Sequence, residues 1–219
     1  MRGQILPGVL EDTSETLLES DQLSAEKEGG QSFADGRLLK AVFIMNIVLI
    51  GYRAAGKSTV GRRVAELTQM EFVDTDDLLE ERQGAGISEI VESMGWDHFR
   101  AMEKKVIEEV SGGDQLIIAA GGGAVLDSEN VISLKRNGLI IWLKADRQVL
   151  YKRMDLDPRT KSSRPTLTGK GPLEELEEIM AYREPFYEQA ADIQFDTADL
   201  GVEEVAESIL SIIGNRMGD

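Results

Sequence analysis

The feature that most constrains this chain is a phosphate-binding motif that lies between an apolar run and a helical pattern. The run Ile44–Ile50 is apolar and rich in β-branched residues. The eight residues that follow, Gly51–Ser58, fit the pattern G-x-x-x-x-G-K-[ST]. Val60, Val64 and Leu67 then recur at helical spacing. A strand, a glycine-bounded loop and a helix in this order predict a nucleotide-binding α/β domain.

The residue types of this motif suit a phosphate. Glycine lets backbone N–H groups turn inward around an anion, and the following helix adds the positive end of its dipole. We expect Lys57 to reach the β- and γ-phosphates of ATP and the Ser58 hydroxyl to ligate Mg²⁺. A plain glycine turn with an accidental lysine is the alternative. The expected nucleotide-binding residues of the loop are Gly51, Ala54, Ala55, Gly56, Lys57, Ser58 and Thr59.

The composition narrows the function classes. A length of 219 residues suits one α/β domain with an appended segment. The net charge of −16 disfavours nucleic acid as a partner, and no apolar run reaches the roughly 18 residues that span a bilayer. Cysteine is absent, and no basic region with an apolar core marks a secretory signal. We expect a cytoplasmic monomer.

The first part of the chain differs in composition from the rest. Residues 1–40 hold eight acids and four bases with several Ser and Gly. This composition predicts a disordered acidic extension over residues 1–44. The alternative is that Met45 is the natural start, because the domain pattern begins there without loss. In either case, residues 45–219 form the predicted domain.

From Met45 the chain alternates strands and helices, which predicts a three-layer α/β/α architecture around a five-stranded parallel sheet. The first predicted strand ends at Ile50, and the other four span Glu71–Val73, Leu116–Ala120, Leu139–Leu143 and Ile193–Phe195. The predicted helices are 57–70, 78–82, 87–94, 97–110, 128–136, 147–154, 172–186 and 202–213. Residues 155–171 interrupt the rhythm with prolines, glycines and basic residues, so we expect a mobile lid there.

Two acids follow the second strand, where open α/β sheets place their binding crevices. Asp74 and Asp76 are two positions apart. One carboxylate can therefore face Mg²⁺ and its waters while the other faces a substrate hydroxyl. Helix capping is the competing explanation, because acids are also favoured at a helix N-terminus.

Three successive glycines, Gly121–Gly123, directly follow the third strand. A simple turn needs only one or two glycines, and each costs backbone entropy. Close approach of a ligand to the backbone explains the third glycine, and a flexible loop is the alternative.

Three arginines stand out by position. Arg100 precedes Glu103 by one helical turn, so that carboxylate can hold its guanidinium. Arg183 falls on the apolar side of a helix and needs either an anionic partner or a route to solvent. A bound carboxylate would suit both, because guanidinium grips it in a bidentate fork. Arg164 lies in the lid, where closure can bring it to a transferring phosphoryl group, or where it is a solvated loop charge.

Together these residues resemble the shikimate kinase family, within the P-loop nucleoside monophosphate kinase-like group. The matching segments run in the family's order over about 175 residues. They are Gly51–Arg62, Phe72–Asp76, Phe99–Arg100 with Glu103, Gly121–Gly123, Arg164–Pro165 and Tyr182–Arg183 followed by Tyr187. The glycine loop alone is shared by many NTPases, whereas the combination is far more specific.

The resemblance implies a P-loop kinase fold and transfer of the ATP γ-phosphate to the 3-hydroxyl of shikimate, in the pathway to chorismate and aromatic amino acids. It implies catalytic roles for Asp76, Lys57 and Arg164, the last also contacting the nucleotide. Ser58 and Asp74 would serve Mg²⁺. The implied shikimate-binding residues are Asp76, Arg100, Gly121, Gly122, Gly123 and Arg183.

The chain departs from the family pattern in two places. Ala54 and Ala55 replace a glycine and a small hydroxyl residue, and we expect little effect. The lid before Arg164 does not match closely, so Arg153 and Arg159 are both candidates for stacking on adenine. Two other functions stay open: a kinase acting on gluconate or a nucleoside monophosphate, and a nucleotide-dependent switch without kinase activity.

Overall fold

Five parallel strands organise the part of the chain that can be described. The structure is a computed structural model that describes residues 45–156 and 171–217. The strands are β1 (Asn46–Ile50), β2 (Glu71–Asp74), β3 (Leu116–Ala119), β4 (Gly138–Lys144) and β5 (Ile193–Asp196). They form one sheet in the order β2-β3-β1-β4-β5, and every pair is parallel. The predicted five-stranded parallel sheet is confirmed.

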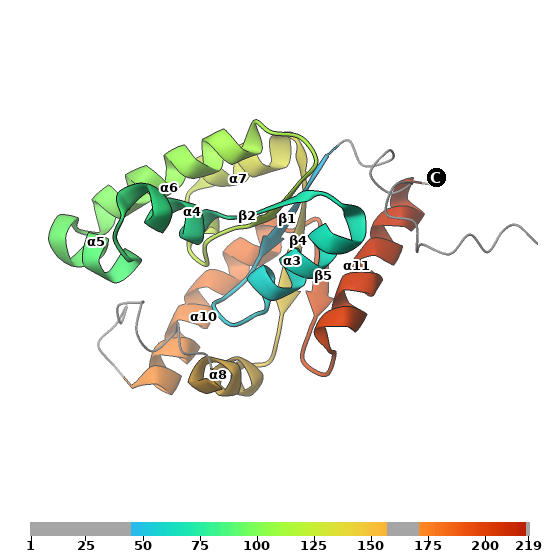
Figure 1. Cartoon of the computed structure of the whole chain (residues 1–219). Coiled ribbons are helices and arrows are strands. Elements are labelled where there is room, and N and C mark those ends of the chain that lie inside the picture. Colours follow the sequence, from blue (N-terminus) through green and yellow to red (C-terminus); the bar gives the residue numbers. More distant parts are fainter. Residues whose placement is uncertain (1–44, 157–170, 218–219) are drawn as a thin grey trace, which may run out of the picture. The chain divides into compact units, whose positions relative to one another are not determined.

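Helices connect the strands and cover both faces of the sheet (Figure 1). The α-helices are α3 (Lys57–Thr68), α4 (Thr75–Gln83), α5 (Ile87–Met94), α6 (Trp96–Ser111), α7 (Ser128–Arg136), α8 (Arg147–Leu156), α10 (Pro172–Ala190) and α11 (Val202–Met217). A short 3₁₀ turn, η1 (Ala124–Leu126), follows the glycine-rich stretch. The alternation of strand and helix gives the three layers that the pattern predicts.

The two faces of the sheet bury separate apolar cores. Because side chains alternate along a strand, Ile47 and Leu49 of β1 face a core shared with α3, α11 and the first part of α10. Val48 and Ile50 face a second core, with α6, α7 and the end of α10. Each core residue of β1 is at most 1% exposed. The central strand is therefore held on both sides, and the loop that follows it starts from a rigid position.

Three helices differ from the predicted bounds by three or four residues at one end, and one of them, α11, continues to Met217 instead of ending at 213. The helix expected over 78–82 begins at Thr75, because the Asp74 side chain accepts hydrogen bonds from the Asp76 and Asp77 N–H groups and caps the helix three residues earlier. The helix α10 continues through Pro185 to Ala190, beyond the predicted end at 186. A proline removes one helical hydrogen bond, but the buried residues beyond it keep the last turn packed.

The segment 155–171, for which a lid is predicted, overlaps described residues at both ends. Asp155 and Leu156 are the last residues of α8, and Gly171 is the N-cap of α10. Residues 157–170, which include Arg159 and Arg164, lie outside the described residues, as does the predicted extension 1–44. None of the helices within the described ranges combines the length and apolarity that crossing a membrane requires.

The sheet register brings three predicted segments to one edge. Leu49 of β1 pairs with Ala119 of β3, and Ala119 also pairs with Asp74 of β2. The residues that follow these positions are the phosphate-binding motif, the two acids and the three glycines. All three segments therefore leave the carboxyl ends of neighbouring strands, which is where α/β folds place their sites.

A prediction follows from the tight contact at the start of β4. A Cβ atom at Gly138 would lie 2.5 Å from the Leu134 carbonyl oxygen and 2.8 Å from Val48 Cγ2. We expect Gly138→Ala to lower the free energy of unfolding by about 1–3 kcal/mol in urea denaturation, because the backbone must shift to admit the methyl group. Gly86→Ala is the control, since its Cβ would meet only the end of Glu80, at 3.7 Å. Equal losses in the two variants would contradict this explanation.

Candidate active site

The phosphate-binding loop between β1 and α3 has a backbone that requires glycine at both ends. Gly51 and Gly56 have φ angles of 141° and 95°. A Cβ atom at Gly51 would also lie 2.6 Å from the Leu143 carbonyl oxygen. Gly56 is the N-cap of α3 and, having no side chain, leaves the first N–H groups of the helix uncapped by it. Such N–H groups and the helix dipole favour an anion.

The substitution at Ala54 is less neutral than the sequence suggested. Ala54 has a φ of 60°, a left-handed conformation that glycine adopts without strain. For alanine this conformation costs about 1 kcal/mol or slightly more. Ala54 therefore holds this backbone conformation at a small cost in stability. The next residue, Ala55, is buried and needs no such conformation.

Lys57 and Ser58 lie at the mouth of this loop. The Lys57 ammonium donates to the carbonyl oxygens of Gly51 and Tyr52, both at 3.0 Å, and its side chain thus crosses the loop. The Ser58 hydroxyl donates to Asp74 Oδ2 at 2.6 Å, which joins the loop to the end of β2. The other oxygen of Asp74 caps α4. Asp74 therefore caps the helix, as the competing explanation expects, and its second carboxylate oxygen lies beside the loop.

The oxygen atoms of Ser58 and Asp74 suit Mg²⁺, which takes few protein ligands, better than a metal ion that is bound by protein side chains alone. Within the described ranges, no group of three or more His, Cys, Asp or Glu side chains gathers as a metal cluster. Mg²⁺ keeps several waters and binds through one or two protein oxygens plus substrate phosphates. A serine hydroxyl and one carboxylate next to a phosphate loop match this coordination preference. Ser58 and Asp74 would hold the ion.

A second pocket opens beside the loop and is lined by five of the six residues predicted to bind the substrate, while Gly121 is not among its lining residues. Asp76, Arg100, Gly122, Gly123 and Arg183 line it together. They come from α4, α6, the glycine segment and α10. Side chains that are up to 107 residues apart, from Asp76 to Arg183, thus face one space. Within this pocket the sequence predictions converge.

The two outer glycines, Gly121 and Gly123, are packed closely against charged side chains, whereas Gly122 has room for a Cβ atom. A Cβ atom at Gly121 would lie 2.6 Å from Asp76 Oδ1 and 2.8 Å from Glu103 Oε1. At Gly123 it would collide with the Arg100 guanidinium. Packing against charged side chains therefore explains the glycines at positions 121 and 123, without a flexible loop.

Arg100 is held in place from several sides. Its Nη1 donates to Glu103 Oε2 at 2.6 Å, and Glu103 is 2% exposed. The guanidinium also lies 5.2 Å from the ring centre of Phe99 and 5.5 Å from that of Trp96. Burial raises the pKa of Glu103, and the nearby Arg100 only partly offsets this, while Asp76 raises the pKa further. The pair thus presents an oriented cation to the pocket.

Arg183 is buried beneath the same pocket. It is 8% exposed, and its Nη1 donates to the Gly122 carbonyl oxygen at 3.0 Å. Its Nε is buried and has no hydrogen-bond partner among the described residues. A buried guanidinium N–H normally finds an acceptor, so Arg183 keeps an unmet hydrogen-bond donor at the pocket that it lines. The Tyr187 hydroxyl donates to the same Gly122 oxygen, and burial raises the pKa of Tyr187 to about 12, so the proton stays in place.

A third hollow lies on the other side of the loop, along Ala54–Gly56. It is lined by Thr59 of α3, Arg153 of α8 and the residues around Thr197 and Val202. Arg153 donates to the Thr197 hydroxyl at 3.0 Å and to the Thr197 carbonyl at 2.6 Å. Of the two arginines considered for adenine, Arg153 therefore borders the hollow, while Arg159 lies outside the described residues.

Some residues of the site escaped the sequence predictions. Arg53, inside the phosphate-binding motif, forms an ion pair with Glu175 of α10, and both are largely buried. A variable position of the motif gives no signal, and Glu175 belongs to an acidic run that looks like a solvated helix face. Thr197, which anchors Arg153, follows the last strand and carries no recognisable pattern.

Comparison with known proteins decides the family. The family model described as shikimate kinase matches residues 53–214, about three quarters of the chain. The chain belongs to the shikimate kinase family. It is 40% identical to a shikimate kinase of Caldanaerobacter subterraneus subsp. tengcongensis, over 75% of this chain and 94% of that protein. It is also 40% identical to one of Symbiobacterium thermophilum, over 78% of this chain and 98% of that protein.

Solved structures agree with the family assignment. The shikimate kinase from Acinetobacter baumannii in complex with shikimate is 32% identical, with a TM-score of 0.76, over 83% of this chain and 98% of that one. A gluconokinase from Sinorhizobium meliloti, at 16% identity and a TM-score of 0.50, shares the fold. The predictions of a P-loop kinase fold, of a nucleotide-using enzyme and of the shikimate kinase family are confirmed.

The raised pKa of the buried Glu103 predicts that the stability of the protein depends on pH. A carboxyl whose pKa is raised in the folded state contributes stability that is lost as pH rises through that pKa. We expect the free energy of unfolding of Glu103→Gln to increase relative to that of wild type as pH rises above 4.5, the ordinary pKa of a glutamate carboxyl. Urea denaturation at a series of pH values measures this difference.

Glu109→Gln is the control with the opposite sign. Its hydrogen bonds from Arg82 lower the pKa of Glu109, so wild type gains relative to that variant as pH rises. A pH-independent difference for Glu103→Gln would mean that the carboxyl titrates normally in the folded protein.

Proposed function

We propose that this chain transfers the γ-phosphate of ATP to the 3-hydroxyl of shikimate, giving shikimate 3-phosphate and ADP. Family membership supports the reaction, and the relatives that carry the name shikimate kinase match this chain over nearly their whole length. The acceptor pocket supports the substrate, since it combines a carboxylate with two oriented arginines beside a phosphate loop.

The observation that carries the substrate assignment is Arg183. Its buried Nε lacks a hydrogen-bond acceptor among the described residues, while Arg100 faces the same pocket. Two guanidinium groups that line one pocket favour a ligand with negative charge, even though Glu103 pairs with Arg100. A carboxylate is planar and accepts paired N–H bonds, so it suits them in shape and in charge. Shikimate carries its carboxylate on a ring whose hydroxyls can then point to Asp76.

The half of the site that would bind ATP acts mainly by positioning the phosphates, and it does little covalent chemistry. The uncapped N–H groups of α3 and the backbone of Gly51–Gly56 would cradle the phosphates, and Lys57 would exchange its carbonyl partners for phosphate oxygens. Mg²⁺ held by Ser58 and Asp74 would neutralise phosphate charge. Arg153 would lie by the adenosine end. Arg164 remains a proposed contact to the phosphates.

The acceptor side supplies the proton step. Asp76 stands in the first turn of α4, beside Gly121 and facing the pocket. In this proposal its carboxylate orients the 3-hydroxyl and accepts its proton. The hydroxyl oxygen forms a bond to the γ-phosphorus while the bond from that phosphorus to the bridging β–γ oxygen breaks. ADP then leaves with that oxygen. Glu103 and the glycine segment fix the geometry of the step.

Several wider properties remain proposals of the same kind. We infer that residues 45–219 form the kinase domain and residues 1–44 an appended segment. The net charge of −16 supports a protein without a nucleic acid partner. We also propose that the enzyme is monomeric and acts in the cytoplasm, where its product would serve aromatic amino acid synthesis.

The experiment that tests the function offers acceptors side by side. ADP release is followed with shikimate, gluconate and AMP at equal concentration. Release with shikimate alone is the expected result, because gluconate and AMP do not place one carboxylate and a ring hydroxyl at the spacing of Arg183 and Asp76. Release with only gluconate or AMP would overturn the proposal. Release with none of them would favour a nucleotide-dependent switch.

Asp76→Asn tests the proton step. We expect turnover with shikimate to fall by about 100-fold or more, because the amide orients the hydroxyl but cannot accept its proton. ATP affinity, measured by calorimetry, should stay within about twofold of wild type. Asp77→Asn is the matched control, since Asp77 lies in the same helical turn but pairs with Arg62 at the surface, at 3.1 Å. Turnover of Asp76→Asn near the wild-type level would remove Asp76 from the chemistry.

Arg183→Lys tests the carboxylate contact. Lysine keeps the charge but loses the paired N–H donors, so we expect shikimate to bind about 10–100-fold more weakly. The KM for ATP should change by no more than about twofold. Arg147→Lys on α8 is the control, because Arg147 pairs with Glu184 of the same helix α10 at the exposed surface. Unchanged shikimate affinity in Arg183→Lys would exclude the contact.

A further inference from the structure

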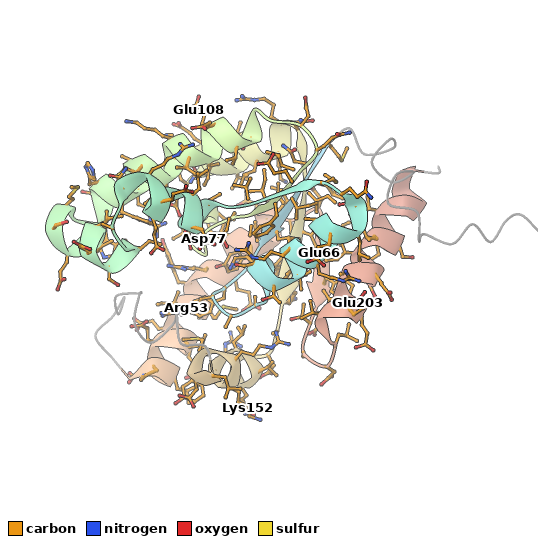
Figure 2. The ribbon with its side chains drawn as sticks, in the orientation of Figure 1. Arg53, Glu66, Asp77, Glu108, Lys152 and Glu203 are labelled. Carbon is orange, nitrogen blue, oxygen red and sulfur yellow. The ribbon has the colours of Figure 1, made fainter. Side chains whose placement is uncertain are left out.

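One buried ion pair joins the two halves of the site. Arg53 Nη2 donates to Glu175 Oε1, and the two side chains are 11% and 4% exposed. Arg53 belongs to the phosphate loop, and Figure 2 shows it on the side of that loop where α10 lies. Its Nε also donates to the Tyr52 hydroxyl at 3.2 Å. Burying two charges is costly unless both are paired and hydrogen-bonded, and both conditions are met here.

Arg53 lies at the boundary between the phosphate loop, which would hold the phosphate donor, and the pocket for the phosphate acceptor. Arg53 lines the acceptor pocket together with Asp76 and Arg183. A Cβ atom at Gly122 would lie 3.6 Å from the Gly51 carbonyl oxygen and 3.7 Å from the Arg53 nitrogen. The glycine segment thus packs directly on the phosphate loop at Arg53. A phosphoryl group that passes from the loop to an acceptor in the pocket must cross this boundary.

The charges around the pocket have a pattern. Arg100 is paired with Glu103, and Arg53 is paired with Glu175. Arg183 is the cation with an N–H lacking a described acceptor, and Asp76 is the carboxylate at the hydroxyl position. The unphosphorylated acceptor carries one negative charge, whereas the product carries an added phosphate of about two more. A bare guanidinium at the boundary would therefore favour the product.

We propose that Arg53 contacts the phosphoryl group on the acceptor side and that Glu175 is a positioning residue that limits the strength of this contact. This inference rests on the proposed function. With Glu175 in place, the guanidinium is held in reach of the transferring group but its charge is shared. The new phosphate ester must compete with a carboxylate for Arg53, so the product leaves readily. Without Glu175, Arg53 becomes a buried cation whose best partner is the product phosphate.

The test compares product and substrate affinities in three variants. Shikimate 3-phosphate and shikimate are titrated by calorimetry into wild type, Glu175→Gln, Arg53→Gln and the double variant. We expect Glu175→Gln to bind shikimate 3-phosphate about 10-fold more tightly, because a charge-assisted hydrogen bond loses its competitor. Arg53→Gln should bind it about 3–10-fold more weakly. The double variant should match Arg53→Gln in product affinity, and in each variant the affinity for shikimate should change less than the affinity for shikimate 3-phosphate.

The control is Glu184→Gln on the same helix, whose carboxylate pairs with Arg147 at the exposed surface. Its product affinity should equal that of wild type. If Glu175→Gln fails to fold, Glu175→Asp replaces it, since the shorter side chain keeps the charge but cannot reach Arg53 equally well. Its product affinity should then lie between wild type and about 10-fold tighter.

The outcomes separate this inference from the function. Unchanged product affinity in Glu175→Gln, or tighter binding that persists in the double variant, would overturn the inference while wild-type turnover of shikimate leaves the function intact. A wild type that neither binds nor phosphorylates shikimate would overturn the function itself. Tighter product binding in Glu175→Gln that is abolished by Arg53→Gln supports both.

Discussion

The close approach of charged side chains to the backbone of Gly121–Gly123 is the constraint on which the rest of the site depends. Asp76 and Glu103 lie against Gly121, and the Arg100 guanidinium lies against Gly123. The Gly122 carbonyl oxygen accepts from Arg183 and Tyr187. Without side chains in this segment, three elements can aim their charges at one pocket. A single methyl group at either outer glycine would displace a carboxylate or a guanidinium.

The parallel sheet turns this local packing into a two-substrate site. Because β1, β2 and β3 are neighbours and run in the same direction, the phosphate loop, Asp74 and the glycine segment meet at one edge. The helix α10 then crosses both halves: Glu175 reaches the phosphate loop, and Arg183 reaches the glycine segment. Donor and acceptor are thereby held by the same rigid frame, which suits a reaction that depends mainly on positioning.

The fold and most site residues could be predicted from the sequence because their signals are local. The phosphate loop has a fixed spacing, Asp74 and Asp76 follow a strand, and Arg183 sits on an apolar helix face. The Arg53–Glu175 pair could not be predicted, since its partners are 122 residues apart and each has an ordinary local setting. The left-handed backbone of Ala54 could not be predicted for a different reason, because alanine rarely adopts a positive φ and so gives no signal of one in the sequence.

The central claim is that the acceptor pocket recognises the carboxylate of a small hydroxylated ring. Calorimetric titration of the wild-type protein with shikimate and with shikimate methyl ester tests this directly, because the ester keeps the ring and hydroxyls but lacks the charge. We expect shikimate to bind and the ester to bind about 10–100-fold more weakly, because the ester loses charge-assisted hydrogen bonds to arginine. Equal affinity for the two compounds would contradict it.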